Sequence, residues 1–149
     1  TNNHVWWPYV PDSMTTAQMD QFFCGAVILL YGEAFVDQFT EATIRAPEVL
    51  ELIKKMDARA DQGIDQRGQA YRHAIVAEVR LKDGRVLEIK KDHAKGSDVF
   101  PLTRDEVVDK FFRLSTKVLS KERADRLYRD VLRVDEVADI KELIKAFNP

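Results

Sequence analysis

The sequence contains little cysteine: Cys24 is the one thiol among 149 residues, which excludes an internal disulfide. Cys24 lies within the apolar run of residues 22–31, where a small buried side chain is expected rather than a reactive thiol. A chain without disulfides suits a reducing compartment, so we expect a cytoplasmic protein. Its fold must then depend on a hydrophobic core, and 45% apolar residues are enough to form one.

Neither sign of charge dominates, because 23 Lys and Arg residues are interspersed with 25 Asp and Glu residues. Nucleic acid needs a concentrated positive surface, so we expect no nucleic-acid partner. The sequence also lacks a long apolar run, since residues 22–31 are about half of a membrane span. No signal-peptide pattern opens the chain. We therefore expect a soluble protein without a membrane partner.

The sequence lacks the usual metal and cofactor motifs. None of its three histidines, His4, His73 and His93, has a second His, Cys or carboxylate at the helical spacing that metal sites favour. The six glycines are scattered and form no phosphate loop, dinucleotide fingerprint or nucleophile elbow. We expect neither a metal nor a cofactor.

Helical patterns fill the first third of the chain. Residues 15–18 have capping-box spacing, so one helix is expected from Thr15 to Tyr31, with Gly32 as its left-handed stop. Because residues 22–31 are apolar on every side, we expect other elements to surround them. A short helix is expected at residues 34–39, and Pro47 predicts a third. The buried side of the third helix would comprise Val49, Leu50, Leu52, Ile53 and Met56.

The middle of the chain changes to a period of two. Residues 75–81 and 87–90 alternate on either side of Asp83-Gly84, which predicts a hairpin with a two-residue turn. An isolated hairpin is marginally stable, so a third strand is expected from residues 5–10 or from residues 56–60. Residues 61–69 are polar and contain two glycines, which predicts a loop.

The helical period returns after a loop at residues 92–102. A second capping box at residues 103–106 opens a helix, Ser120 precedes another, and a third reaches Phe147. The predicted class is α+β, with a small antiparallel sheet packed with helices and followed by C-terminal helices.

Residues 92–97 form the stretch with the most versatile chemistry. His93, Lys95 and Gly96 place an imidazole, an ammonium and a flexible backbone in one loop, which suits a carboxylate ligand. The alternative is a solvated connector in which Gly96 adopts a positive φ. A second candidate surface is the aromatic cluster at the N-terminus, comprising Trp6, Trp7 and Tyr9. Either a partner covers this cluster or it packs into the core of the domain.

Three segments share an order and spacing with a known family. Residues 17–32 are similar to an Ala-Lys-Phe-Ser-Leu-Pro-Tyr helix that ends in Leu-Leu-Asp-Gly, and residues 39–52 to a segment in which Pro precedes a helix. Residues 79–112 resemble an Asp-Gly-Arg hairpin, a Lys-Gly loop and a Pro-Leu-Ser helix that contains Lys-Phe-Arg. Together they resemble the C-terminal portion of the MmgE/PrpD family, which includes 2-methylcitrate dehydratase, cis-aconitate decarboxylase and iminodisuccinate epimerase.

This resemblance implies a small α+β lid whose terminal helices return to a large all-helical domain with most of the catalytic residues. We expect one domain over residues 1–149, with a lid core at residues 1–101 and C-terminal helices at residues 102–149. A lid of this kind would act on a small carboxylic acid with a separate all-helical subunit, as part of a lyase or epimerase. It would not be catalytic alone, and an oligomer is possible. Trp6, Trp7 and Tyr9 would suit the interface with the partner.

Two positions depart from the family pattern. The family tyrosine that faces the substrate corresponds to Phe23, which has no hydroxyl, and a family lysine corresponds to Gln18. The resemblance leaves Phe23 as a pocket wall, while His93 and Lys95 approach the substrate from the lid. The alternative is a non-catalytic interaction or regulatory module that binds a partner through Trp6 and Trp7. An enzyme confined to this chain ranks last, because no acid, base and orienting group can be assigned together.

Overall fold

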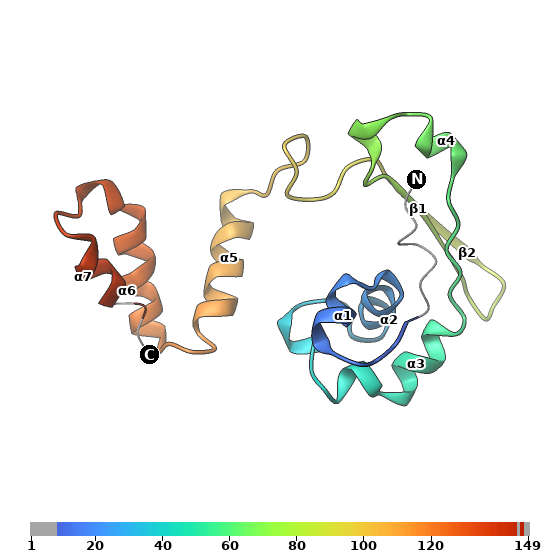
Figure 1. The fold of residues 1–149 in the computed structure, drawn as a ribbon, viewed down its shortest axis with the longest axis horizontal. Helices are drawn as coiled ribbons and strands as arrows, with labels where there is room; N and C mark the ends of the chain where they lie inside the picture. The colour runs from blue at the N-terminus through green and yellow to red at the C-terminus, as the bar shows by residue number, and fades with distance from the viewer. Residues whose placement is uncertain (1–8, 146, 148–149) are drawn as a thin grey trace. The chain divides into compact units, whose positions relative to one another are not determined.

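The computed structural model describes residues 9–145 and residue 147, and it confirms the predicted α+β class (Figure 1). The elements are α1 (Met14–Met19), α2 (Gln21–Tyr31), α3 (Pro47–Ile53), α4 (Gln62–Asp65), β1 (Ile75–Arg80), β2 (Val86–Lys91), α5 (Arg104–Ser115), α6 (Lys121–Leu132) and α7 (Ile140–Lys145). The chain divides into two compact units, Thr1–Arg72 and His73–Pro149. The expected division at residues 101 and 102 stays a prediction.

The first predicted helix is divided at Asp20, so the prediction of one continuous helix from Thr15 is wrong. The Ser13 Oγ accepts a hydrogen bond from the Thr16 N–H at 3.2 Å and caps α1. Asp20 is extended, and its carboxylate accepts from the Phe23 N–H at 2.8 Å, which starts α2. The break occurs because a short acidic side chain competes with the helix backbone for amide donors.

α2 ends as predicted, at Gly32 with a φ of 85°. The expectation that α2 is surrounded is wrong for this chain by itself, because one side is buried and its last turns are open. The buried side comprises Phe23, Ala26 and Val27. The exposed fractions are 49% for Ile28, 51% for Leu29 and 42% for Leu30.

The core of the N-terminal unit lies between α2 and α3. Its fully buried side chains are Ala17, Phe23, Ala26, Val27, Ile44 and Val49. Pro47 opens α3 as predicted, and Leu52, Ile53 and Met56 pack against this core. The short helix expected at residues 34–39 is a single 3-10 turn, Val36–Gln38.

Two predictions between α3 and the hairpin are wrong. Residues 56–60, one of the two candidates for a third strand, form no strand, and the loop expected at residues 61–69 contains α4. The other candidate, residues 5–10, lies outside the described residues except for Tyr9 and Val10, which are not in a strand. The Asp61 carboxylate caps α4 by accepting from the N–H groups of Gly63 at 2.7 Å and Ile64 at 3.2 Å. Across residues 9–145, the sheet consists of β1 and β2 alone.

The hairpin has the predicted faces but a longer turn. Ala77 pairs with Ile89 and Val79 with Leu87, so the apolar residues of the two strands share one face. The Leu81 N–H donates to the Arg85 carbonyl at 2.8 Å, which leaves a three-residue loop rather than two. Gly84 ends this loop with a φ of 89°, the left-handed residue that a three-residue hairpin requires. Within this chain Ile75, Leu87 and Ile89 remain about half exposed.

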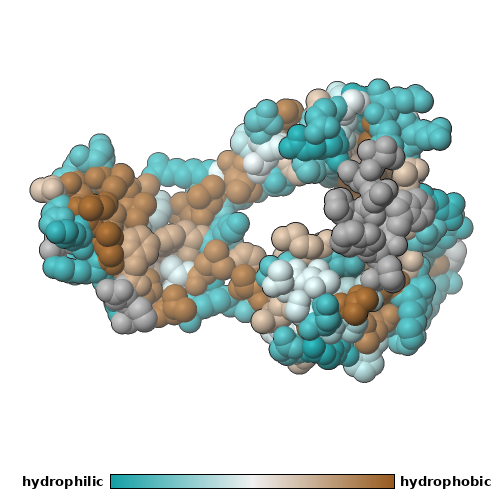
Figure 2. Space-filling view, viewed as in Figure 1, coloured by the Kyte–Doolittle hydropathy of each residue, from teal (hydrophilic) through white to brown (hydrophobic). Residues whose placement is uncertain are grey.

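The three predicted C-terminal helices are confirmed, and so are the predicted caps of α5 and α6, but α7 ends at Lys145 and Phe147 lies in a turn. Thr103 and Glu106 form the capping box of α5, and the Ser120 Oγ accepts from the Arg123 N–H at 3.3 Å to cap α6. The small core here comprises Leu119, Ala124, Leu127 and Leu143. Further apolar residues gather at the surface over α6 and α7 (Figure 2). Within the described residues, no helix is both long and apolar enough to span a bilayer.

Candidate functional site

The loop after β2 is closed by its own hydrogen bonds. The Gly96 N–H donates to the Phe100 carbonyl at 2.7 Å, and the Phe100 N–H donates to the Ser97 Oγ at 3.1 Å. Gly96 has a φ of 90°, the positive value that is expected if the loop is a solvated connector. The loop therefore has a defined backbone on which His93 and Lys95 are placed.

Lys95 is held from two directions within this loop. Its Nζ lies 3.0 Å from the Glu106 Oε2 at the start of α5. The same ammonium lies 4.5 Å from the centroid of the Phe100 ring, a cation–π distance. Its side chain is still 38% exposed, so a ligand can reach the ammonium.

Glu106 has three donors on one carboxylate oxygen. The Oε2 accepts from the Thr103 N–H at 2.8 Å and the Thr103 hydroxyl at 3.0 Å, besides Lys95. The hydrogen bond from the Thr103 amide, followed by that from Lys95, lowers the pKa of Glu106. Glu106 therefore carries a fixed negative charge at neutral pH and connects the loop to α5.

An open depression lies beside the same loop, and its lining residues are Lys90, Lys91, Asp92, His93, Val99 and Phe100. Lys90 is paired with Glu88 at 3.1 Å. His93 is half-buried, and Phe100 and Val99 supply an apolar wall. Cations next to an aromatic ring suit a small organic anion more than a neutral ligand.

The residues predicted from the first family segment lie in the N-terminal unit. Phe23 is fully buried, stacked on Tyr9 with ring centroids 5.4 Å apart and tilted against Phe39 at 5.5 Å. Gln18 is exposed on α1. Phe23 thus serves the core of its unit, and the structure divides the predicted site residues between the two units.

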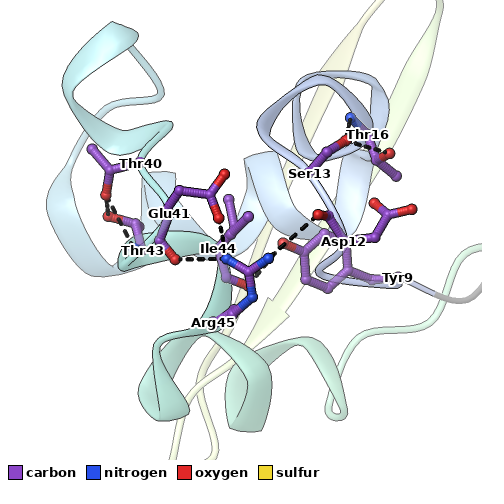
Figure 3. Close-up of polar contacts among 9 residues, drawn as sticks. All are labelled: Tyr9, Asp12, Ser13, Thr16, Thr40, Glu41, Thr43, Ile44 and Arg45. Carbon is purple, nitrogen blue, oxygen red and sulfur yellow. Dashed lines mark hydrogen bonds and ion pairs between the residues drawn. The ribbon is translucent and has the colours of Figure 1, made fainter.

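Tyr9 joins the segment before α1 to the turn at Ile44, as Figure 3 shows. Its hydroxyl donates to the Ile44 carbonyl at 2.9 Å. Burial, and then the charge of Asp20, raise the pKa of Tyr9 to about 12. Tyr9 is half-buried and has a structural hydrogen bond, whereas Trp6 and Trp7 lie outside the described residues. A partner role for these three residues stays a prediction.

Cys24 has the environment of a structural thiol. It is half-buried, and burial followed by the charge of Asp20 raises its pKa. A raised pKa keeps a thiol protonated at neutral pH and therefore weakly nucleophilic. Within the described part of the chain, no three His, Cys, Asp or Glu side chains gather as a metal site would require.

Glu106 and Phe100 belong to the site, although no sequence pattern predicted them there. The capping box located Glu106 at the start of a helix, but the spacing gave no sign that its carboxylate also reaches Lys95. The positive φ of Gly96 is the signal for Phe100, because a tight turn there returns the chain toward the lysine.

Comparison with protein-family models defines the class of this protein. Residues 1–134 match the MmgE/PrpD C-terminal domain, so the chain belongs to the MmgE/PrpD family and corresponds to that C-terminal portion. It is also similar to the cis-aconitate decarboxylase-like protein oryM of Aspergillus oryzae, with 32% identity over 134 residues. This match covers 90% of the chain but 27% of the relative. The family resemblance inferred from the sequence is confirmed.

Proposed function

We propose that this chain is the lid of a lyase-type enzyme that acts on a small carboxylic acid together with a separate all-helical domain. In a dehydration, a base in the helical domain removes a proton next to a carboxylate, and a β-leaving group departs with the electron pair. In a decarboxylation, carbon dioxide departs instead, and an acid in the helical domain protonates the carbon that keeps the electron pair. The lid closes over the substrate and excludes water. The observation that carries this proposal is the family match over residues 1–134.

The loop of the C-terminal unit supports a binding role for the lid. Lys95 is partly exposed and paired with Glu106 at the start of α5, and Phe100 gives the loop an apolar surface. An ammonium binds a carboxylate as a point charge without demanding one geometry. This arrangement suits orientation of a substrate carboxylate better than proton transfer.

The N-terminal unit supports a lid that binds substrate while a helical domain carries out proton transfer. Phe23 is buried against Tyr9 and Phe39 and has no titratable group. Proton transfer requires a positioned acid or base, which Phe23 cannot provide, so the proposal assigns proton transfer to the helical domain.

The test combines the chain with an N-terminal helical domain of the family and follows the consumption of cis-aconitate. We expect turnover when both are present and none with either alone. Lys95→Ala should raise KM with a smaller effect on kcat, because it removes binding rather than chemistry. Lys54→Ala, which removes another exposed and paired lysine, is the matched control. An inert mixture, or unchanged kinetics in Lys95→Ala, would contradict the proposal.

A second candidate is a non-catalytic interaction module, and the exposed apolar residues of α2 and α7 favour it. In this case the chain binds a partner through the N-terminal aromatic residues. Scrambling residues 92–97 would leave the complex and its turnover intact, whereas polar substitutions of Trp6 and Trp7 would dissociate it. The test is to purify the untagged chain from its source and to measure the mass of the recovered complex. The mass shows whether a helical partner accompanies the chain.

A further inference from the structure

The Lys95 side chain pairs with a charged residue outside its own loop. We propose that Glu106 is a positioning residue that fixes the Lys95 ammonium to receive a substrate carboxylate. The inference rests on the lid function proposed above and adds a residue that does not itself contact the substrate. Its structural basis is the 3.0 Å contact between the Lys95 Nζ and the Glu106 Oε2.

A lysine side chain needs such fixing because it has many rotamers to lose when it binds. The loop backbone is already set by the hydrogen bond from the Gly96 N–H to the Phe100 carbonyl at 2.7 Å. Glu106 and the Phe100 ring then hold the far end of the Lys95 side chain. An ammonium has three N–H donors, so one bond to Glu106 leaves capacity for a second carboxylate. The loop thus presents a partly neutralised but pre-organised cation.

Glu106 can perform this role because it is itself immobilised. Thr103 donates to its Oε2 through the backbone N–H at 2.8 Å and the hydroxyl at 3.0 Å. The Thr103 Oγ1 in turn accepts from the Glu106 N–H at 3.2 Å, which completes the capping box. The first turn of α5 therefore holds the Glu106 carboxylate in place, and this carboxylate pairs with the Lys95 ammonium.

Glu106→Gln separates this role from helix capping, since glutamine can occupy the same capping-box position without the charge. In the reconstituted enzyme we expect KM for cis-aconitate to rise about fivefold, the upper range for an exposed ion pair, with kcat changed less than about twofold. The matched control is Glu122→Gln, which removes an acidic residue from the first turn of α6. An unchanged KM in Glu106→Gln would overturn the inference.

A double-mutant cycle tests whether Glu106 acts through Lys95. We expect Lys95→Met to raise KM, and the combination with Glu106→Gln to raise it no further, because the two residues form one unit. Additive effects would assign Glu106 an independent structural role and overturn the inference. No effect of Lys95→Met on KM would remove the role of both residues.

A measurement on the chain alone keeps this inference distinct from the proposed function. Carbon-13 relaxation at the Lys95 Cε should show larger-amplitude motion in Glu106→Gln than in wild type, and no difference in Glu122→Gln. Unchanged Lys95 motion would overturn the inference whether or not the complex is active. An inactive mixture with increased Lys95 motion would instead contradict the proposed function and leave the fixing of Lys95 by Glu106 supported.

Discussion

The core of the N-terminal unit and the candidate loop of the C-terminal unit are organised by different interactions. In the N-terminal unit, Phe23, Ile44 and Val49 have no exposed surface, and aromatic rings stack around Phe23. In the C-terminal unit, the candidate loop lies at the surface and is defined by hydrogen bonds, a capping box and an ion pair. This difference teaches that burial stabilises one unit while local polar contacts shape the loop proposed to bind substrate.

The largest expected effect is that of Phe23→Ala, which removes the central ring of the N-terminal core. The cavity should lower the free energy of unfolding by about 3–5 kcal/mol, measured by urea denaturation. Met19→Ala is the control, because Met19 is 84% exposed and should change stability by less than about 0.5 kcal/mol. A loss below about 1 kcal/mol in Phe23→Ala would show that the first unit does not depend on this core.

Local chemistry made several elements predictable from the sequence. Pro47 can stand only at the start of its helix, Gly32 accepts a left-handed conformation, and the capping box at Thr103 satisfies amides that would otherwise lack partners. The hairpin faces follow from strict alternation. Each of these signals involves residues within a few positions of one another.

Features that depend on competition or on distant contacts were not predictable. Asp20 divides the first helix because its carboxylate outcompetes continued helix formation, although residues 15–18 have equally good capping spacing. The second contact of Glu106 and the burial of Phe23 depend on residues far away in the sequence. The exposure of the last turns of α2 was not predictable either. An apolar run indicates that a helix is covered, but not whether residues of the same chain cover it.

The next largest effect is expected in the C-terminal unit, from Gly96→Ala. A Cβ would lie 3.8 Å from the Leu102 Cγ, so there is room for it, and the penalty of about 1–2 kcal/mol is that of the left-handed backbone. Amide exchange at residue 96, whose N–H donates to Phe100, should accelerate.

Gly25→Ala is the matched control for Gly96→Ala. Gly25 lies inside α2, where a Cβ would meet the Met56 Cε at an ordinary 3.7 Å, so alanine should stabilise the helix by about 0.5–1 kcal/mol. If amide exchange at residue 96 is no faster in Gly96→Ala than in wild type, the left-handed backbone does not destabilise the loop.

A smaller effect is expected for Tyr9→Phe, which keeps the ring on Phe23 but removes the hydrogen bond to the Ile44 carbonyl. The free energy of unfolding should fall by about 1 kcal/mol in urea denaturation at neutral pH. An unchanged stability would mean that stacking on Phe23 alone holds Tyr9 in place.

Tyr9 also predicts a pH dependence of stability. Its pKa is raised from 10.0 to about 12 in the folded chain, so the folded state retains this proton where the unfolded state loses it. The contribution is fully present below pH 10 and is lost as the pH rises from 10 to about 12. In Tyr9→Phe this part of the alkaline decrease should disappear, and an identical alkaline profile in both proteins would contradict it.

The smallest effect is expected for Glu41→Gln, which removes a surface charge next to the N-terminal core (Figure 3). The Arg45 guanidinium pairs with the Glu41 carboxylate, but it also donates to the Glu41 carbonyl at 3.2 Å and the Asp12 carbonyl at 3.3 Å. Both carbonyl contacts survive the substitution, and exposed helical ion pairs contribute about 0.3–0.5 kcal/mol. The loss should therefore stay below about 0.5 kcal/mol and vanish in about 1 M salt, where screening acts over about 3 Å. A larger loss of unfolding free energy that does not depend on salt would mean that polar surface contacts also stabilise the N-terminal unit. The N-terminal core and the candidate loop would then no longer differ in the interactions that organise them.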